Sequence, residues 1–119
     1  MLNGSCHCGA VKLSFDGAPK ALVRCNCSIC VRLGTLWGHG TEGVITVTAE
    51  PDATLAYVWG DKELAFHTCK TCGCTTHWIA VKDEELRQMA MNMALVDANM
   101  LGDLRIRHFD GANTWEFTD

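Results

Sequence analysis

Basic residues are scarce in this sequence. Lysine and arginine together number 10 against 14 aspartates and glutamates, and the net charge is −4. No basic tract of about five to eight residues is present. Because a protein that binds nucleic acid through its phosphates carries a basic patch or stripe, we expect no nucleic-acid partner.

Long hydrophobic runs are also lacking. No stretch approaches the roughly 18 apolar residues of a membrane helix, and the opening MLNGSCHCG has no basic segment followed by an apolar run, as a secretion signal would. The sequence therefore predicts no membrane segment and a cytoplasmic location. Thiols stay reduced in that compartment, so cysteines there bind metals more readily than they form disulfides.

Low-complexity stretches and linkers are absent as well. The chain has 119 residues, of which 48% are hydrophobic and 20% are charged. This composition is typical of a folded protein, and the length suits one domain that buries roughly two-thirds of the surface of its unfolded chain. We predict a single domain over residues 1–119.

Cysteine is what the sequence has in abundance. The eight cysteines fall into three clusters, Cys6-x-Cys8, Cys25-x-Cys27-x2-Cys30 and Cys69-x2-Cys72-x-Cys74. Disulfides within such short loops would be strained, whereas closely spaced thiolates chelate a metal ion well. Buried free cysteines are one alternative. An iron–sulfur cluster is another, which the Cys-x-Cys spacing disfavours.

Two of the clusters have the pattern of zinc knuckles. In CHCG and CKTCG a glycine, Gly9 or Gly73, follows the second cysteine. The chain must turn sharply there, and glycine adopts a positive φ most easily. Two half-sites with two thiolates each complete one tetrahedral Zn²⁺ site. The predicted ligands of this structural zinc are Cys6, Cys8, Cys69 and Cys72.

The third cluster, RCNCSICVR, supplies only three thiolates, from Cys25, Cys27 and Cys30. Zinc with three protein ligands keeps a fourth position for water or substrate. Three thiolates weaken the Lewis acidity of the ion, so a substrate thiol suits this site better than an activated water does. The cluster predicts a second zinc with an open position where chemistry takes place.

A protein side chain could close this site instead. Cys74 is the first candidate, although it could equally be a small apolar core residue or a redox-active partner. His77 is a second candidate, with a surface histidine or a general base as other interpretations. His39 is a third, and its glycine-flanked segment favours a turn. Arg32, just after the cluster, could hold a substrate carboxylate or simply be a solvated arginine.

The rest of the chain has the pattern of a mostly β protein. Short alternating stretches predict strands at 10–15, 21–24, 44–49, 53–59, 64–68 and 75–81, and a final hairpin of 104–109 with 114–117. Residues 83–101 have the propensity of a helix. Met89, Met91 and Met93 nevertheless alternate as in a strand, and we expect them, like Trp37 and Trp78, to lie in the core.

GSCHCGAV (4–11), RCNCSICVR (24–32) and HTCKTCG (67–73), in this order, resemble the glutathione-dependent formaldehyde-activating enzyme family, which also contains centromere protein V. The resemblance implies a β-tent fold of the Mss4-like type with little helix. It implies two zinc ions, one on each cysteine group described above. It also implies a strand at 87–93, against the helix propensity, with at most one helical turn at 83–86.

The function implied by the resemblance is that of a carbon–sulfur lyase. Such an enzyme joins glutathione to formaldehyde, or reverses that step, in aldehyde detoxification. The three-cysteine cluster suits thiol chemistry, but the identity of the thiol rests on the resemblance alone. The alternative is a non-catalytic zinc module that binds a protein partner, since function lies in the site and not in the fold.

Overall fold

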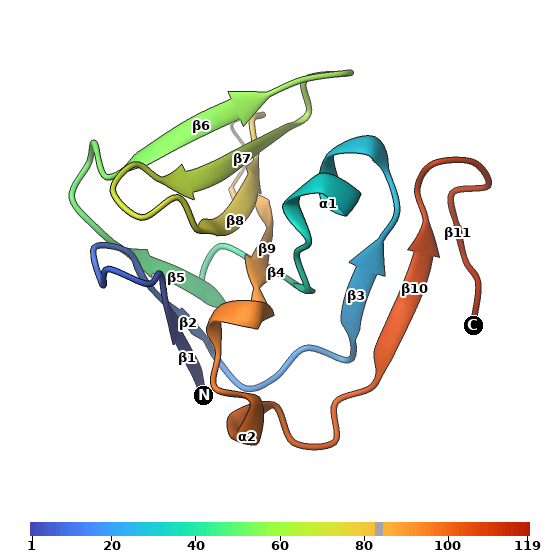
Figure 1. Cartoon of the computed structure of the whole chain (residues 1–119), viewed down its shortest axis with the longest axis horizontal. Coiled ribbons are helices and arrows are strands. Elements are labelled where there is room, and N and C mark those ends of the chain that lie inside the picture. Colours follow the sequence, from blue (N-terminus) through green and yellow to red (C-terminus); the bar gives the residue numbers. More distant parts are fainter. Residues whose placement is uncertain (83–84) are drawn as a thin grey trace.

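The protein is mostly β, as the sequence predicts (Figure 1). The structure, a computed structural model, describes residues 1–82 and 85–119. Its strands are β1 (Leu2–Ser5), β2 (Lys12–Phe15), β3 (Leu22–Cys25), β4 (Trp37–Thr41), β5 (Ile45–Thr48), β6 (Thr54–Val58), β7 (Leu64–Cys69), β8 (Thr75–Ala80), β9 (Gln88–Asn92), β10 (Ile106–Asp110) and β11 (Glu116–Phe117). The helices are α1 (Ser28–Leu33), the 3-10 helix η1 (Met93–Leu95) and α2 (Ala98–Leu101). Within the described residues, no helix has the length and hydropathy of a membrane span.

The strands form two sheets. The smaller sheet has the order β1-β2-β5, and the larger has the order β11-β10-β3-β4-β9-β8-β7-β6. Neighbouring strands are antiparallel except for β3 and β10, which run parallel. In Figure 1, β3, β10 and β11 lie on one side of α1, while β6 and β7 lie on its other side. This two-sheet arrangement is consistent with the expected β-tent.

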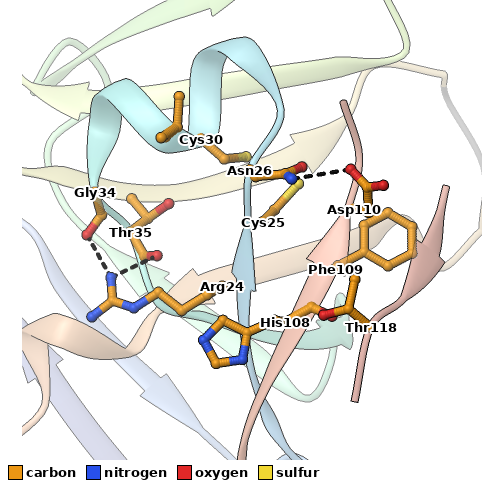
Figure 2. Close-up of a pocket in the computed structure, with 11 residues that line it drawn as sticks. Arg24, Cys25, Asn26, Cys30, Gly34, Thr35, His108, Phe109, Asp110 and Thr118 are labelled. Atoms are coloured by element: carbon orange, nitrogen blue, oxygen red, sulfur yellow. Dashed lines mark hydrogen bonds between the residues drawn. The ribbon is translucent and has the colours of Figure 1, made fainter. Parts of the chain in front are cut away.

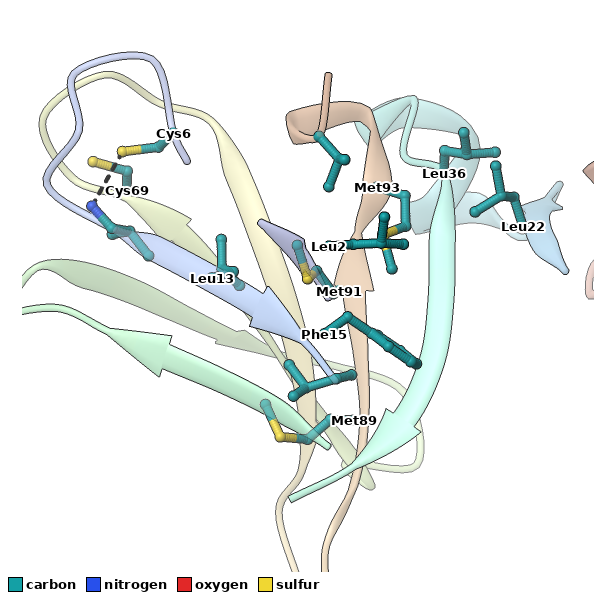
Figure 3. Close-up of a cluster of buried hydrophobic side chains, with 13 residues drawn as sticks. Leu2, Cys6, Leu13, Phe15, Leu22, Leu36, Cys69, Met89, Met91 and Met93 are labelled. Carbon is teal, nitrogen blue, oxygen red and sulfur yellow. Dashed lines mark hydrogen bonds between the residues drawn. The ribbon is translucent and has the colours of Figure 1, made fainter. Parts of the chain in front are cut away.

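The strand β2 shows why alternation predicts a half-buried strand. Leu13 and Phe15 are buried, whereas Lys12 is exposed. The strand pairs with β1 on one side and β5 on the other. Its apolar face joins the main core cluster together with Leu2 and Ile45, as Figure 3 shows for most of these side chains.

The strand predicted over 87–93 is confirmed as β9. Met89 and Met91 lie in the main core cluster, and Ala90 on the opposite face is buried in a second cluster with Trp37 and Trp78. β9 pairs with β4 along one edge and β8 along the other. Because both faces and both edges of the segment are covered, tertiary packing overrides its helix propensity.

The other predicted strands are confirmed with bounds that differ by up to two residues at either end, including the final hairpin of β10 and β11. Sequence reasoning missed β1, α1 and β4. The helical turn expected at 83–86 falls partly on residues 83–84, which lie outside the described residues, and residues 85 and 86 form a bend. The missed elements carry little alternation, so periodicity contained no signal for them.

The strand β4 shows that a turn is the wrong interpretation of WGHGTEG. Gly38 and Gly40 pair with β9 and have no positive φ. A Cβ on Gly38 would lie 2.5 Å from the Met93 side chain, and one on Gly40 would lie 3.2 Å from the Phe15 ring. These glycines are required because the strand packs too closely on the core for a side chain. His39, between them, projects to the opposite face.

Candidate metal centres and the adjoining cavity

The four cysteines of the predicted structural site come together in the structure. All four sulfurs lie within 4.8 Å of one another. Cys8 Sγ is 3.7 Å from Cys6 Sγ and 3.7 Å from Cys69 Sγ. A tetrahedral zinc with Zn–S bonds of about 2.3 Å places its sulfurs about 3.8 Å apart. Cys6, Cys8, Cys69 and Cys72, here called the four-cysteine centre, therefore fit such an ion.

Each half of this centre is shaped by the glycine turn that the sequence predicted. The Gly9 N–H donates to the Cys6 carbonyl at 3.1 Å, and the Gly73 N–H donates to the Cys69 carbonyl at 2.9 Å. The φ angles of the two glycines are 84° and 81°, values that side chains disfavour. Both turns fold the chain back so that their thiols point to one place.

Backbone N–H groups favour thiolates at this centre. The Val11 N–H donates to Cys6 Sγ at 3.3 Å. The backbone N–H groups of Cys74 and Cys8 lower the pKa of the Cys72 thiol to about 5. Metal binding requires deprotonated sulfur, so this arrangement is prepared for an ion.

A second group of sulfurs forms around α1. Cys25 ends β3, Cys27 is the residue before α1, and Cys30 lies in its first turn. The three sulfurs lie within 4.8 Å of one another. Because β3 passes directly into a helix that begins at Ser28, the chain turns within the cluster, and this turn brings the three thiols together. Cys25, Cys27 and Cys30 are here called the three-cysteine centre.

Charge and hydrogen bonding prepare these sulfurs as well. The Cys30 thiol donates to Cys25, which lowers the pKa of Cys25 to about 5, and the same bond together with burial raises the pKa of Cys30. The indole N–H of Trp37 donates to Cys30 Sγ at 3.4 Å. A soft metal ion binds thiolates and displaces the protons that clustered thiols share. Three sulfurs in this arrangement therefore fit zinc.

A clamp from the C-terminal hairpin holds the cysteine loop (Figure 2). Asn26 donates to Asp110 Oδ1 at 3.0 Å and accepts from the Ala112 N–H at 3.0 Å. A Cβ on Gly111 would lie 2.7 Å from Cys25 Sγ. The turn after β10 therefore packs directly against the metal-binding loop. Sequence reasoning missed this clamp, since 84 residues separate Asn26 from Asp110.

The predicted fourth ligands do not join the three-cysteine centre. Within residues 1–82 and 85–119, no other Cys, His, Asp or Glu has a ligand atom within 4.8 Å of all three sulfurs. Cys74 packs against the main core cluster, and its carbonyl accepts the Cys69 N–H at 2.9 Å, which places it beside the four-cysteine centre. An ion held at the three-cysteine centre would therefore have three protein ligands among the described residues, and these three residues lie beside an open space.

That space is a cavity of about 800 Å³. Cys25, Cys27 and Cys30 form part of its lining. All four tryptophans of the chain and three of its four phenylalanines also line it, namely Trp37, Trp59, Trp78, Trp115, Phe66, Phe109 and Phe117. Trp37 and Trp78, predicted as core residues, are indeed buried, and they also form the floor of this cavity. A smaller hollow of about 320 Å³, shown in Figure 2, lies on another side of Cys25 and Cys30.

Few polar side chains reach the larger cavity. They are His39, Asp61, Glu63 and Gln88. His39 stacks edge-on against Trp78 with ring centroids 5.8 Å apart. The His39 ring is accessible to solvent through the cavity, yet the surrounding protein atoms desolvate it and lower its pKa. A neutral imidazole that is able to accept a proton thus lies in the cavity wall.

Two further candidates lie elsewhere. Arg32 is exposed, donates to the Ser28 carbonyl at 2.8 Å and lines neither of the two cavities. Its role as a carboxylate anchor stays a prediction. His77 is not the surface residue that the sequence favoured: it is 5% exposed and bonds Thr76 Oγ1 at 2.8 Å. Its ring stacks on His67 at 4.5 Å, and it does not line the cavity.

A mostly β scaffold with two cysteine groups able to hold metal ions defines the class of this protein. The chain belongs to the glutathione-dependent formaldehyde-activating enzyme family, whose model matches residues 1–107. It is similar to a Rhodobacter sphaeroides protein of known crystal structure, with 27% identity and a TM-score of 0.68 over 88% of this chain and 99% of that one. No curated protein matches the chain.

Proposed function

We propose that this protein is a zinc-dependent carbon–sulfur lyase that acts on a thiol–aldehyde adduct, with the S-hydroxymethylglutathione type as the model substrate, in aldehyde detoxification. One observation carries the proposal. The three-cysteine centre lines the cavity of about 800 Å³, whereas the ligands of the four-cysteine centre are not among the described residues that line it. A site with three protein ligands beside a substrate-sized space is typical of a catalytic zinc.

Cys25, Cys27 and Cys30 would hold the ion. When bound there, zinc with thiolate ligands and an open position accepts a substrate thiol and lowers its pKa. In the forward direction the substrate sulfur forms a bond to the aldehyde carbon, and the proton of the thiol ends on the carbonyl oxygen. The reverse direction breaks that carbon–sulfur bond and returns the proton to sulfur.

The cavity residues provide orientation and proton transfer. The aromatic side chains surround the adduct on several sides and would limit its contact with water. His39 is neutral near pH 7 because desolvation lowers its pKa, so it can take the thiol proton and return it to the oxygen. Trp37 donates its indole N–H to Cys30 Sγ and so would orient this ligand when an ion is bound.

The test follows exchange between formaldehyde and glutathione by NMR in the presence and absence of the zinc-loaded protein. We expect catalysis to exceed the spontaneous rate, and Cys25→Ser to abolish it while the protein stays folded with one zinc. His39→Gln should lower the rate and leave the zinc content at two. A rate equal to the uncatalysed one for every thiol tested would refute the lyase assignment.

The alternative, a non-catalytic zinc module with a protein partner, is favoured by one observation. β6 ends the larger sheet, and it exposes Leu55, Tyr57 and Val58 by 61%, 52% and 39%. Such an edge can pair with another chain. The two functions depend on different parts of the protein. If it is a lyase, Trp78→Ala in the cavity should lower catalysis. If it is a binding module, Tyr57→Lys on β6 should lower partner binding.

A further inference from the structure

The charged side chains that line the cavity, among the described residues, are all acidic. Its described lining contains two carboxylates, Asp61 and Glu63, and no lysine or arginine. Three thiolates around one Zn²⁺ would add a further net charge of about −1. Asp61 and Glu63 are both exposed at the cavity. A thiol with carboxylates at its far end, as in a glutathione adduct, would enter against this negative charge.

The basic residues Arg107, Lys62 and Arg87 are close in sequence to residues of the cavity but do not belong to its lining. Arg107 lies 3.9 Å from the Phe117 ring centroid, and its guanidinium also donates to the Asp119 carbonyl at 2.9 Å. Lys62 lies between the two acidic residues in sequence but is not part of the lining. Arg87 forms a salt bridge with Glu42 at 3.9 Å. None of the three cations is among the residues that line the cavity.

The walls next to the carboxylates are aromatic and open. Trp59 directly precedes Gly60 and Asp61 on one side of the cavity, and Trp115 and Phe117 come from the C-terminal hairpin. Trp59, Trp115 and Phe117 are 38%, 71% and 43% exposed. Aromatic faces attract cations, and more strongly where water is excluded. The aromatic rings and the carboxylates of this cavity therefore both favour a positive charge on a ligand.

We propose that the thiol this cavity prefers carries a cationic group at its far end, held by Asp61, Glu63 and the aromatic walls, and that thiols with terminal carboxylates, glutathione among them, bind there more weakly. The inference rests on the proposed function, because it names the substrate class of that same site. The C-terminal hairpin belongs to this selection. Trp115 and Phe117 of this hairpin lie beyond residues 1–107, the part of the chain that the family model matches.

Binding is tested first, because four tryptophans in the lining report on an occupant by their fluorescence. The zinc-loaded protein is titrated with thiocholine, a permanent cation, and with its neutral isostere 3,3-dimethylbutane-1-thiol. The anionic comparisons are 3-mercaptopropionate and glutathione. We expect thiocholine to bind about tenfold more tightly than the isostere, and the anionic thiols to bind more weakly than both. The same four thiols are then compared in NMR exchange with formaldehyde.

The variant that tests the carboxylates is Asp61→Asn combined with Glu63→Gln. The asparagine side chain would keep an oxygen for the Glu63 N–H, which Asp61 now accepts at 3.2 Å. The matched control is Glu50→Gln with Asp52→Asn, which removes the same charge from exposed residues outside the lining. We expect the preference for thiocholine over its isostere to fall to about threefold or less in the first pair and to persist in the control.

The outcomes separate this inference from the proposed function. Equal binding of thiocholine and its isostere, or tighter binding of the anionic thiols, overturns the inference even if glutathione exchange is catalysed. Preferential binding of thiocholine with no catalysed exchange of any thiol supports the ligand class and overturns the lyase. Preference in both binding and exchange, lost in the Asp61–Glu63 pair alone, supports both.

Discussion

The two cysteine centres obtain their ligands in different ways. The four-cysteine centre joins residues 6–8 to a turn more than 60 residues later, between β7 and β8. The three-cysteine centre takes all its ligands from six consecutive positions. An ion that links distant segments closes a long loop and so stabilises the fold, but an ion held by one short loop closes almost nothing. An ion at the three-cysteine centre would therefore depend on the fold to hold it and would add little to the stability of that fold.

Removing one ligand from each centre should have the largest effect and tests whether only the four-cysteine centre is needed for folding. Cys72→Ser should leave the protein unfolded at 25 °C, because structural zinc contributes about 10 kcal/mol or more, as much as the whole stability of a typical domain. Cys25→Ser should stay folded and retain one zinc. Near-UV circular dichroism and elemental zinc analysis measure the two effects. A folded Cys72→Ser or an unfolded Cys25→Ser would reverse the assignment of roles.

Acid should destabilise the fold through the β7–β8 hairpin, which carries Cys69 and Cys72 of the four-cysteine centre. Burial, with a smaller contribution from His67, lowers the pKa of His77 in β8 to about 3. Below about pH 6.5, His77 is protonated in the unfolded chain but stays neutral in the folded chain down to about pH 3. Protonation therefore favours the unfolded chain, so the stability associated with His77 is complete above about pH 6.5 and falls as the pH drops towards 3. The slope is up to about 1.4 kcal/mol per pH unit.

Urea unfolding at pH 7, 6 and 5 measures this slope. His77→Gln should have a shallower slope than the unchanged protein, because glutamine cannot be protonated in this range. His108→Gln is the comparison, because it removes a histidine outside this hairpin whose side chain is 62% exposed. Equal slopes in all three proteins would mean that the buried histidine pair does not limit stability in acid.

The support of the three-cysteine centre by the C-terminal turn can be tested at Gly111. Gly111→Ala places a methyl group where Cys25 Sγ lies 2.7 Å away, so either the sulfur or the turn must move. We expect zinc affinity at this centre to fall about 10-fold to 100-fold, measured by competition with a chromophoric chelator. Ala112→Ser, the next residue in the same turn, is the control and should change little.

A smaller effect is expected at the clamp itself. Asn26→Ala removes both the bond to Asp110 and the acceptor for the Ala112 N–H. Loss of such an outer support typically weakens a metal site about 10-fold, and the four-cysteine centre should be unaffected. Asn113→Ala is the control, because Asn113 contributes only its backbone N–H to Asp110. Unchanged zinc affinity in Asn26→Ala would show that the loop holds its own geometry.

Much of the fold could be predicted because its signals are local. Leu13 and Phe15 alternate with polar residues, and the structure buries them on one face of β2. Gly9 and Gly73 predict their turns because a positive φ is a property of one residue. The glycines around His39 show the limit. They indicate a turn when only local conformation is considered, yet Gly38 lacks a side chain because Met93, 55 positions later, occupies that space.

The sequence by itself determined how the cysteines group, because knuckle spacing and glycine turns act over a few residues. It also showed that a cluster of three thiolates is available for a second centre, but it left the place of Cys74 open. Only the tertiary structure decided what those three thiolates face. The order of strands in the larger sheet brings Trp59 and Trp115 to one cavity although 56 residues separate them. It also brings Asp110 to Asn26. No local sequence pattern predicts these contacts between distant residues, because they depend on which strands and hairpins the complete fold places side by side.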